Sequence, residues 1–181
     1  MIKGKFVGLR AVEREDLKIM RDWRNLSEFR KNFREYRELN MEMQIKWFEK
    51  FVVEDDDTQM FIIERLKDSK SIGVCGLIYI NWVIKSADIS FYIGEKKAYI
   101  DSLGYADEAL SLLMSYAFSQ LNLHKIWTEL YEFDTKKINF YEKYKFKKDA
   151  VLRDNCFEDG RYWNSYIYSL IQDEFFRNNR G

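Results

Sequence analysis

Residues 88–110 read DISFYIGEKKAYIDSLGYADEAL, a strand that leads through a turn into a helix beginning with small residues. The first turn of a helix exposes unpaired backbone N–H groups and a partial positive charge, so it can hold an anion such as a pyrophosphate. Gly104 would let the backbone approach such an anion closely, and Ala106 adds no bulk. Small residues are common at helix starts, so this segment alone fits a purely structural turn equally well.

A second segment, DTKKINFYEKYKF at residues 134–146, predicts a helix that directly follows the next strand. Tyr141 falls near the middle of this helix, and Phe146 falls at the start of the strand after it. A single tyrosine on a helix is more often a core ring than a proton donor. By itself, this segment indicates packing rather than chemistry.

The rest of the chain alternates between short strands and amphipathic helices. Apolar residues recur at helical spacing where helices are expected and dominate short runs where strands are expected. The predicted order is strand 6–12, helix 15–25, helix 40–53, strands 60–66, 72–82 and 87–94, helix 104–122, strand 125–133, helix 134–145, and a hairpin over 146–175 that turns at 158–160.

This order predicts an α/β fold. Three successive strands joined by short turns indicate an antiparallel meander, whereas the strand–helix–strand crossover from residue 87 to residue 133 requires a parallel pair. The expected sheet is therefore mixed and mostly antiparallel, with one parallel pair at the site and helices on both faces. No repeat or low-complexity linker divides the 181 residues, so a single domain over 1–181 is expected.

The charge balance limits the classes of partner. Lysine and arginine number 30, as do aspartate and glutamate, so the net charge is zero and nucleic acid is not expected. No apolar run approaches the roughly 20 residues that span a bilayer, and the N-terminus lacks an apolar signal core, so no membrane partner and a cytoplasmic location are expected. Cys75 and Cys156 are expected to be free thiols, and no cluster has the spacing of a metal site.

Taken together and in this order, the two segments resemble the GNAT superfamily of acetyl-CoA-dependent N-acetyltransferases. The resemblance is best to the branch that contains ribosomal-protein alanine, spermidine and amino-sugar acetyltransferases. It implies acetyl-CoA as co-substrate, no metal, and direct attack of a bound amine on the thioester. It extends over nearly the whole chain in eight pieces: Leu9-Arg10, Trp23-Arg24-Asn25, Ile72-Gly73, Tyr92-Ile93-Gly94-Glu95, residues 104–110, residues 122–126, residues 140–143 and the turn Glu158-Asp159-Gly160.

The resemblance also implies which residues hold acetyl-CoA. They are the strand end at Ile93 and Gly94, Asp134 at the next helix start, Lys143 near the nucleotide end, and the helix-start residues Leu103, Gly104, Tyr105, Ala106 and Asp107. As a helix N-cap, Asp134 is also what structure alone would require. The phosphate loop of the family begins with Gln or Arg, where this chain has Asp101. Because a carboxylate would repel a pyrophosphate, Asp101 is expected to face solvent.

Tyr141 matches the general acid of the family, which would protonate the departing thiolate of coenzyme A. A backbone N–H near Gly94 is the candidate donor to the acetyl oxygen. Asp88 and Glu129, on the two strands that flank the cofactor site, are candidates for taking a proton from the amine, and a water chain is an equal alternative. His124, the only histidine, matches a structural position of the family rather than a catalytic one.

The acceptor is expected to contact the first two helices, at Arg24, Arg30 and Trp47. The Trp-Arg-Asn pattern at 23–25 resembles acetyltransferases that act on nucleotide-linked amino sugars, in which an arginine could hold phosphates. A small-molecule amine, either an amino sugar nucleotide or a polyamine, is therefore the favoured acceptor. A protein N-terminal acetyltransferase and a non-catalytic acetyl-CoA-binding domain stay open as alternatives. Members of the family are often dimers, so a homodimer is one possibility.

Overall fold

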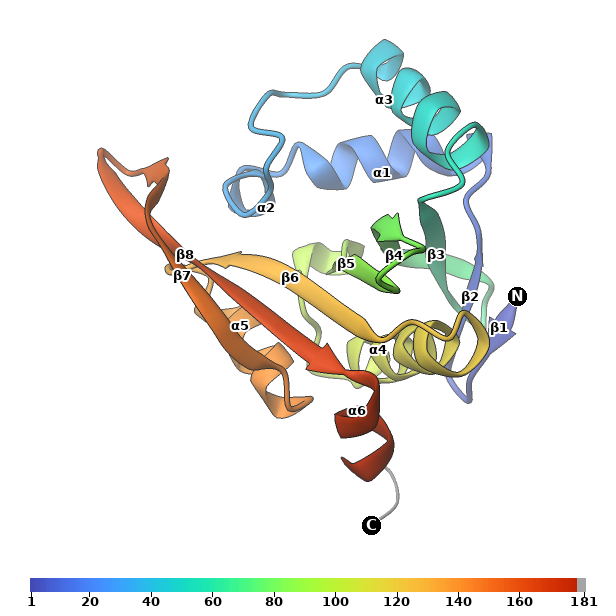
Figure 1. Cartoon of the computed structure of the whole chain (residues 1–181). Helices are drawn as coiled ribbons and strands as arrows, with labels where there is room; N and C mark the ends of the chain where they lie inside the picture. Colours follow the sequence, from blue (N-terminus) through green and yellow to red (C-terminus); the bar gives the residue numbers. More distant parts are fainter. Residues whose placement is uncertain (179–181) are drawn as a thin grey trace.

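The computed structural model describes residues 1–178, in which one mixed sheet carries helices on both of its faces (Figure 1). The strands are β1 (Ile2–Lys3), β2 (Val7–Ala11), β3 (Gln59–Arg65), β4 (Lys70–Asn81), β5 (Ser86–Ile93), β6 (Lys125–Tyr131), β7 (Lys147–Glu158) and β8 (Arg161–Ile171). The helices and helical turns are η1 (Arg14–Asp16), α1 (Leu17–Arg24), α2 (Ser27–Arg30), α3 (Met41–Phe48), η2 (Glu49–Val53), η3 (Glu95–Lys97), α4 (Tyr105–Ser115), η4 (Tyr116–Gln120), α5 (Thr135–Lys143) and α6 (Gln172–Asn178).

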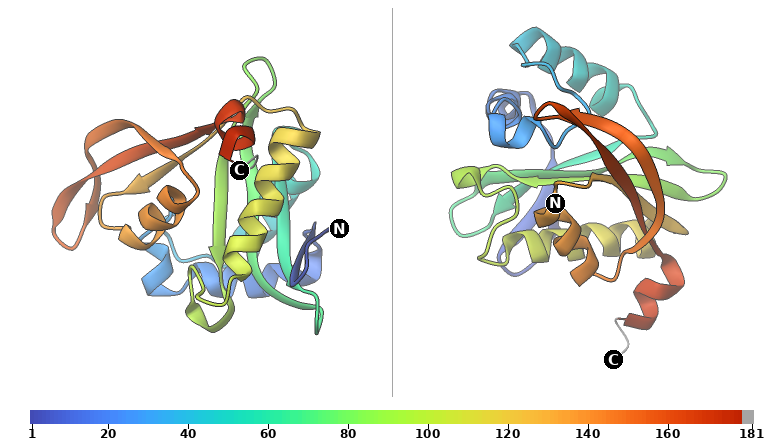
Figure 2. Two further views of the ribbon diagram at one scale, coloured as in Figure 1. Left: turned by 90° about the horizontal axis from the view of Figure 1, so that it is seen from below. Right: turned by 90° about the vertical axis from the view of Figure 1, so that its left-hand side faces the viewer.

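The sheet has the strand order β1-β2-β3-β4-β5-β6-β8-β7, and every neighbouring pair is antiparallel except β5 with β6. The predicted fold class, with a single parallel pair at the crossover, is confirmed. The long β7–β8 hairpin extends beyond the rest of the sheet (Figures 1 and 2). Of the expected domain over 1–181, the last three residues lie outside the part that the structure describes.

The parallel pair is short. Only Ser86–Asp88 of β5 face Lys125–Trp127 of β6, although β5 continues to Ile93 and β6 to Tyr131. The two strands therefore separate halfway along their length, and the second half of β5 does not pair with β6. The candidate active site lies where the two strands separate.

Two helical layers cover the sheet, with α1–α3 on one face and α4 and α5 on the other (Figure 2). The small and aliphatic stripe of α4, which includes Ala106, Leu110 and Leu113, packs into the larger core cluster together with Phe91 and Tyr141. The second core cluster lies under α1 and is built on Leu17, Met20 and Trp23 with the strand residues beneath them.

The element boundaries differ from the prediction in a few places. The expected helix 15–25 begins as the 3-10 turn η1 before α1, and the helices predicted at 40–53 and 104–122 both end in a π turn. Asn40 caps α3, because its side chain accepts from the N–H of Met43. The prediction of a strand as far as Phe175 was wrong. β8 ends at Ile171, and α6 follows, with acidic residues in its first turn that suit a helix start.

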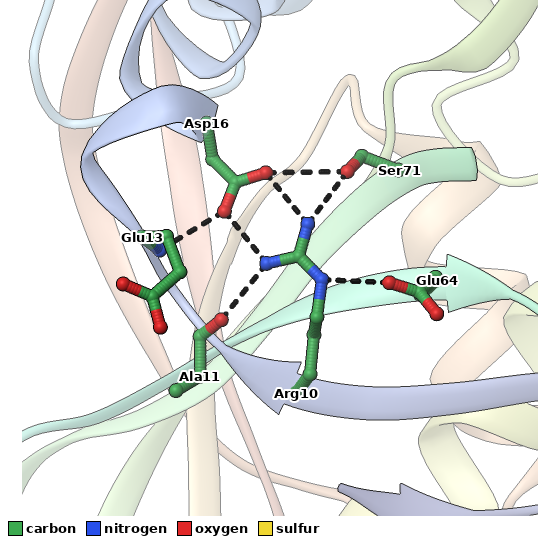
Figure 3. A network of polar contacts seen from close by, with 6 residues as sticks. All are labelled: Arg10, Ala11, Glu13, Asp16, Glu64 and Ser71. Atoms are coloured by element: carbon green, nitrogen blue, oxygen red, sulfur yellow. Dashed lines mark hydrogen bonds and ion pairs between the residues drawn. The ribbon is translucent and has the colours of Figure 1, made fainter. Parts of the chain in front are cut away.

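A polar cluster around Arg10 joins three strands to the start of α1 (Figure 3). The guanidinium forms a fork with both oxygens of Asp16 at 2.7 Å and also donates to Glu64 at 2.8 Å and to Ser71 at 2.9 Å. Burial would raise the pKa of Asp16, but the hydrogen bonds from Arg10 hold this pKa below its usual range. The cluster thereby fixes the helix that carries Trp23 and Arg24 against the sheet.

Candidate active site

A cavity of about 640 Å³ lies between the α1–α3 layer and the sheet. The central strands β4, β5 and β6 line it on one side, and α1, α3 and the segment 32–39 line it on the other. It is therefore located where β5 and β6 begin to separate. Its charged and polar lining consists of Arg24, Asn32, Arg34, Glu35, Arg37, Gln44, Lys46, Lys50, Thr58, Tyr79, Asp88, Ser90, Tyr92, Thr128, Glu129, Tyr131 and Lys137.

The two predicted proton acceptors lie on neighbouring strands and share one cation. Nη1 of Arg34 lies 2.8 Å from Oδ2 of Asp88, and Nε of Arg34 lies 3.5 Å from Oε2 of Glu129. Asp88 is only 2% exposed, and burial raises its pKa to about 6 even though Arg34 opposes the shift. Glu129 also accepts from the hydroxyl of Ser165 at 2.6 Å.

Two further cations line the cavity and lie largely out of solvent. Burial lowers the pKa of Lys137, on the first turn of α5, to about 8, and Asp134 and Asp88 oppose the shift. Burial also lowers the pKa of Arg24, whose guanidinium lies 4.0 Å from the ring centroid of Phe33. Carboxylates oppose both shifts, Glu35 for Arg24 and Asp134 with Asp88 for Lys137, so buried charges of both signs meet at the cavity.

Tyr141 is fully buried, and its hydroxyl is the one buried side-chain oxygen or nitrogen without a hydrogen-bond partner among residues 1–178. Burial raises its pKa well above the ordinary value, and the charges of Asp88 and Asp134 raise it further. The phenol is therefore protonated at neutral pH. An orphaned hydroxyl in a well-packed core requires an explanation, and a ligand group that accepts its hydrogen bond would supply one.

The free edge of β5 is partly occupied. Gly94 donates its N–H to the carbonyl of Ile72, so its backbone groups face β4. Because backbone groups of successive residues in a strand point to opposite sides, those of Phe91 and Ile93 face the gap between β5 and β6. The N–H and C=O of Ile93 are both paired with Tyr99, in the loop that follows, at 2.8 Å. Phe91 is thus the residue whose N–H faces the gap beyond the end of the parallel ladder. The N–H groups of Ile93 and Gly94 are already in use.

Gly94 has a packing role. A Cβ at this position would lie 2.0 Å from the ring of Trp23, closer than real Cβ contacts allow. The glycine therefore permits α1 to lie directly on the end of β5.

The start of α4 is the clearest correction to the sequence-based expectations. Asp101 does not point to solvent. Its carboxylate accepts from the N–H groups of Leu103 at 2.7 Å, Tyr105 at 3.2 Å and Ala106 at 2.6 Å. The expectation was wrong because it considered only repulsion from a pyrophosphate, whereas unpaired amides at a helix start attract any nearby carboxylate. Gly104 adopts the left-handed conformation, with φ of 88°, which allows the turn.

The remaining predicted cofactor residues have partners within the chain. Asp134 caps α5 by accepting from the N–H of Lys137 at 3.1 Å, which confirms the structural role expected for it. The hydroxyl of Tyr99 also donates to Asp134, at 2.6 Å. Lys143 forms an ion pair with Asp107, a residue of the first turn of α4. This pair links α4 to α5.

The predicted acceptor contacts are brought together in part. Arg24 and Trp47 line the cavity, whereas Arg30 is not part of its lining and lies 3.4 Å from Glu38. The cavity also includes Arg34 and Lys137, which had not been predicted as site residues. Arg34 belongs to a basic stretch between two helices, a weak signal. Lys137 follows the N-cap by three residues, and no pattern in the sequence indicates that it is buried.

No helix among residues 1–178 combines the length and apolar character needed to cross a bilayer. Within the same residues, no group of three or more His, Cys, Asp or Glu side chains is arranged to hold a metal ion. Cys75 and Cys156 are both free thiols.

A family profile described as an acetyltransferase (GNAT) domain matches residues 7–147. Spermidine N(1)-acetyltransferase of Escherichia coli (strain K12) is 29% identical over 170 residues, covering 93% of this chain and 88% of that protein. Spermidine N(1)-acetyltransferase of Vibrio cholerae is 27% identical over 176 residues, covering 92% and 94%. A crystal structure of spermidine N-acetyltransferase from Vibrio cholerae in complex with CoA and spermine matches with a TM-score of 0.86 and 25% identity, covering 96% of this chain and 99% of that chain. The chain therefore belongs to the GNAT family of acetyl-CoA-dependent N-acetyltransferases.

Proposed function

We propose that this protein transfers the acetyl group of acetyl-CoA to a primary amine of a small molecule bound in the cavity. The observation that carries this proposal is the orphaned hydroxyl of Tyr141, which lies near enough to Asp88 of β5 for that carboxylate to raise its pKa. A buried phenol without a partner suits a site in which an added group accepts its hydrogen bond.

The residues present fit acetyl-CoA where β5 and β6 separate. The co-substrate supplies an acetyl group that is already activated as a thioester. The N–H of Phe91, which faces the gap, would donate to the acetyl oxygen, because the N–H of Gly94 is bonded to Ile72. The amides of Leu103, Tyr105 and Ala106 would hold the diphosphate, as the family pattern implies.

Proton transfer is assigned to three residues. Asp88, with a pKa of about 6, is ionised at neutral pH and can take a proton from the acceptor amine, whose reference pKa is about 10.4. Glu129 is the second candidate, since it shares Arg34 with Asp88. Tyr141 keeps its proton at neutral pH and can donate it to the departing thiolate.

The charges in the cavity favour an acceptor that carries phosphate. Six basic and three acidic side chains line the cavity. Arg34 and Arg37 are paired with carboxylates, which leaves four cations without a carboxylate within 4.0 Å among residues 1–178: Arg24, Lys46, Lys50 and Lys137. With six cations against three carboxylates, the lining carries a net positive charge, which attracts anionic ligands and repels polycations. We therefore place an amino sugar nucleotide first.

A polyamine is the second candidate, because the relatives in Escherichia coli and Vibrio cholerae are named as spermidine acetyltransferases. In that case Asp88, Glu129 and Glu35 would have to bind the ammonium groups despite the surrounding cations. A protein N-terminal acetyltransferase is less favoured, since neither the relatives nor the cavity charge supports it.

The test is release of coenzyme A thiol from acetyl-CoA with a panel of acceptors: nucleotide-linked amino sugars, spermidine and spermine, and peptides that begin with Ala or Ser. We expect turnover with an amino sugar nucleotide that weakens as ionic strength rises. Turnover with polyamines alone would overturn the phosphate assignment, and turnover with none of the panel would count against the enzyme proposal. Mass measurement in solution tests the homodimer, which stays a prediction.

A further inference from the structure

We infer that the segment Tyr99–Asp101, in the loop between β5 and α4, is an internal plug: its own polar groups occupy the β5 edge and the α4 amides assigned above to acetyl-CoA. Acetyl-CoA then binds only after this segment has moved away. This role rests on the proposed function, because it assumes that the β5 edge and the α4 amides hold the co-substrate. Contacts at three places support it.

The first contact is made by Asp101. Its two carboxylate oxygens accept from three N–H groups at the start of α4, at 2.7, 3.2 and 2.6 Å. These are the amides assigned to the diphosphate, and a carboxylate presents the same chemistry to them as a phosphate does: charged oxygens that accept hydrogen bonds. The two anions cannot occupy these amides together, so the side chain of Asp101 has to leave before a diphosphate can bind.

The second contact is made by the backbone of Tyr99. Its N–H and C=O are both paired with Ile93 at 2.8 Å, which forms a short antiparallel bridge on the edge of β5 that faces the gap. An extended ligand with amide groups would add to the same edge as an extra strand does. The bridge therefore closes the outer end of this edge.

The third contact is made by the side chain of Tyr99. Its hydroxyl donates to Asp134 at 2.6 Å, and its ring is 6% exposed, with the centroid 5.2 Å from that of Phe29. Nearby, Nζ of Lys136 donates to the carbonyl of Ala98 at 2.5 Å. The loop is thus attached both to β5 and to the start of α5.

The loop is also strained, which gives it a reason to open. Lys96, Lys97 and Tyr99 have φ values of 52°, 54° and 61°, in the left-handed region that disfavours residues with a Cβ. Three such residues within four positions persist only where surrounding contacts hold them. The contacts of Tyr99 and Asp101 hold this conformation, and a ligand that replaces them would release the strain.

The consequence is a lowered apparent affinity for acetyl-CoA, because the apparent Kd is the intrinsic Kd divided by the fraction of molecules in the open state. Loss of the charged contacts of Asp101 should raise that fraction. We expect Asp101→Asn, which keeps the side-chain shape, to bind coenzyme A about tenfold more tightly. Tyr99→Phe removes only the contact with Asp134 and should tighten binding by about threefold.

The experiment measures binding of coenzyme A to the full chain by calorimetry, for the wild type, Asp101→Asn, Tyr99→Phe and the exposed neighbour control Ser102→Ala. Hydrogen exchange is followed in parallel. Binding of coenzyme A should speed exchange of the Tyr99 amide, which loses Ile93 as its partner. The amides of Ile93, Leu103, Tyr105 and Ala106 should stay protected, because the ligand takes the places of Tyr99 and Asp101. Ser102→Ala should match the wild type.

The outcomes separate the plug from the enzyme proposal. If Asp101 is only a helix cap, Asp101→Asn lowers the melting temperature and leaves the Kd unchanged or higher, and the Tyr99 amide stays protected with coenzyme A bound. That result overturns the plug and leaves the proposed function standing. A third outcome is tighter binding of coenzyme A by Asp101→Asn, with an unchanged Kd in Tyr99→Phe and no faster exchange of the Tyr99 amide. This would show that Asp101 only repels the ligand by its charge, and it would also overturn the plug. Failure of every variant to bind coenzyme A overturns both proposals.

Discussion

Nη1 of Arg34 lies 2.8 Å from Oδ2 of Asp88 in the cavity between the α1–α3 layer and the sheet. Two opposing effects act on this carboxylate. Burial favours its neutral form, whereas the guanidinium favours its charged form, and the balance gives a pKa of about 6. The cation therefore keeps a buried carboxylate ionised at neutral pH, which a proton acceptor requires.

Replacing Arg34 with Met should raise the pKa of Asp88, because burial then acts with less opposition. If Asp88 is the proton acceptor, it works only when deprotonated, so kcat/KM falls as the pH drops below about 6 in the wild type. In Arg34→Met this acidic limb should move to higher pH by about 1 unit. The pH profile of kcat/KM measures the shift.

Arg37→Met is the matched control for Arg34→Met. Arg37 also lines the cavity, but its partner is Glu35, at 2.7 Å, and it is mostly exposed. Its profile should keep the acidic limb of the wild type. An unchanged limb in Arg34→Met would show that the group seen in the profile is not Asp88.

Asp88→Asn and Glu129→Gln distinguish the two candidate bases. Each change keeps the shape and removes the ability to take a proton. We expect Asp88→Asn to lower kcat by about 100-fold, the usual effect of losing a general base, and Glu129→Gln to lower it by less than about tenfold. The reverse ranking assigns the role to Glu129, and full activity in both variants assigns it to water.

Tyr141→Phe should lower kcat by about 100-fold or more while leaving the Kd for coenzyme A nearly unchanged. Stability gives an independent check. Because the hydroxyl has no partner, its removal should leave the free energy of unfolding unchanged or slightly increased, in contrast to most core substitutions. Wild-type turnover in this variant would remove Tyr141 from the mechanism.

The architecture could be predicted because local patterns determine it. The crossover from residue 87 to residue 133 leaves only one parallel arrangement, and Asn40 and Asp134 each carry the side chain that caps a helix. Such signals act over a few residues, so a single sequence contains them.

The contents of the site depend on contacts between distant residues, which local patterns do not encode. Arg34 donates to Asp88, 54 residues away in the sequence, and Tyr99 donates to Asp134, 35 residues away. The contacts of Asp101 are local, since its partners are two to five residues away, so the sequence could have predicted them. They were not predicted because the amides of α4 were assigned to a diphosphate instead.

The Arg10–Asp16 fork should contribute stability that depends on pH. Because the folded pKa of Asp16 is lowered, this contribution is present above the unfolded pKa of about 3.9 and is lost as the pH falls through the folded value. Arg10→Met should therefore lose about 1–3 kcal/mol at pH 7, and the difference from the wild type should narrow in acid. Urea unfolding at several pH values measures this. The exposed pair of Lys18 and Asp22 supplies the control, since Lys18→Met should change stability by less than about 1 kcal/mol.

Gly94→Ala tests whether this glycine serves packing or the co-substrate. A Cβ would lie 2.0 Å from the ring of Trp23, so the substitution should destabilise the fold by about 1–3 kcal/mol. Adding Trp23→Leu removes the clash, and in the double variant the cost of the alanine should largely disappear. Thermal unfolding of the two single variants and the double variant gives this coupling energy. A different result would assign Gly94 to the co-substrate: the losses of stability of the two single variants add up in the double variant, and the double variant binds coenzyme A more weakly than the wild type.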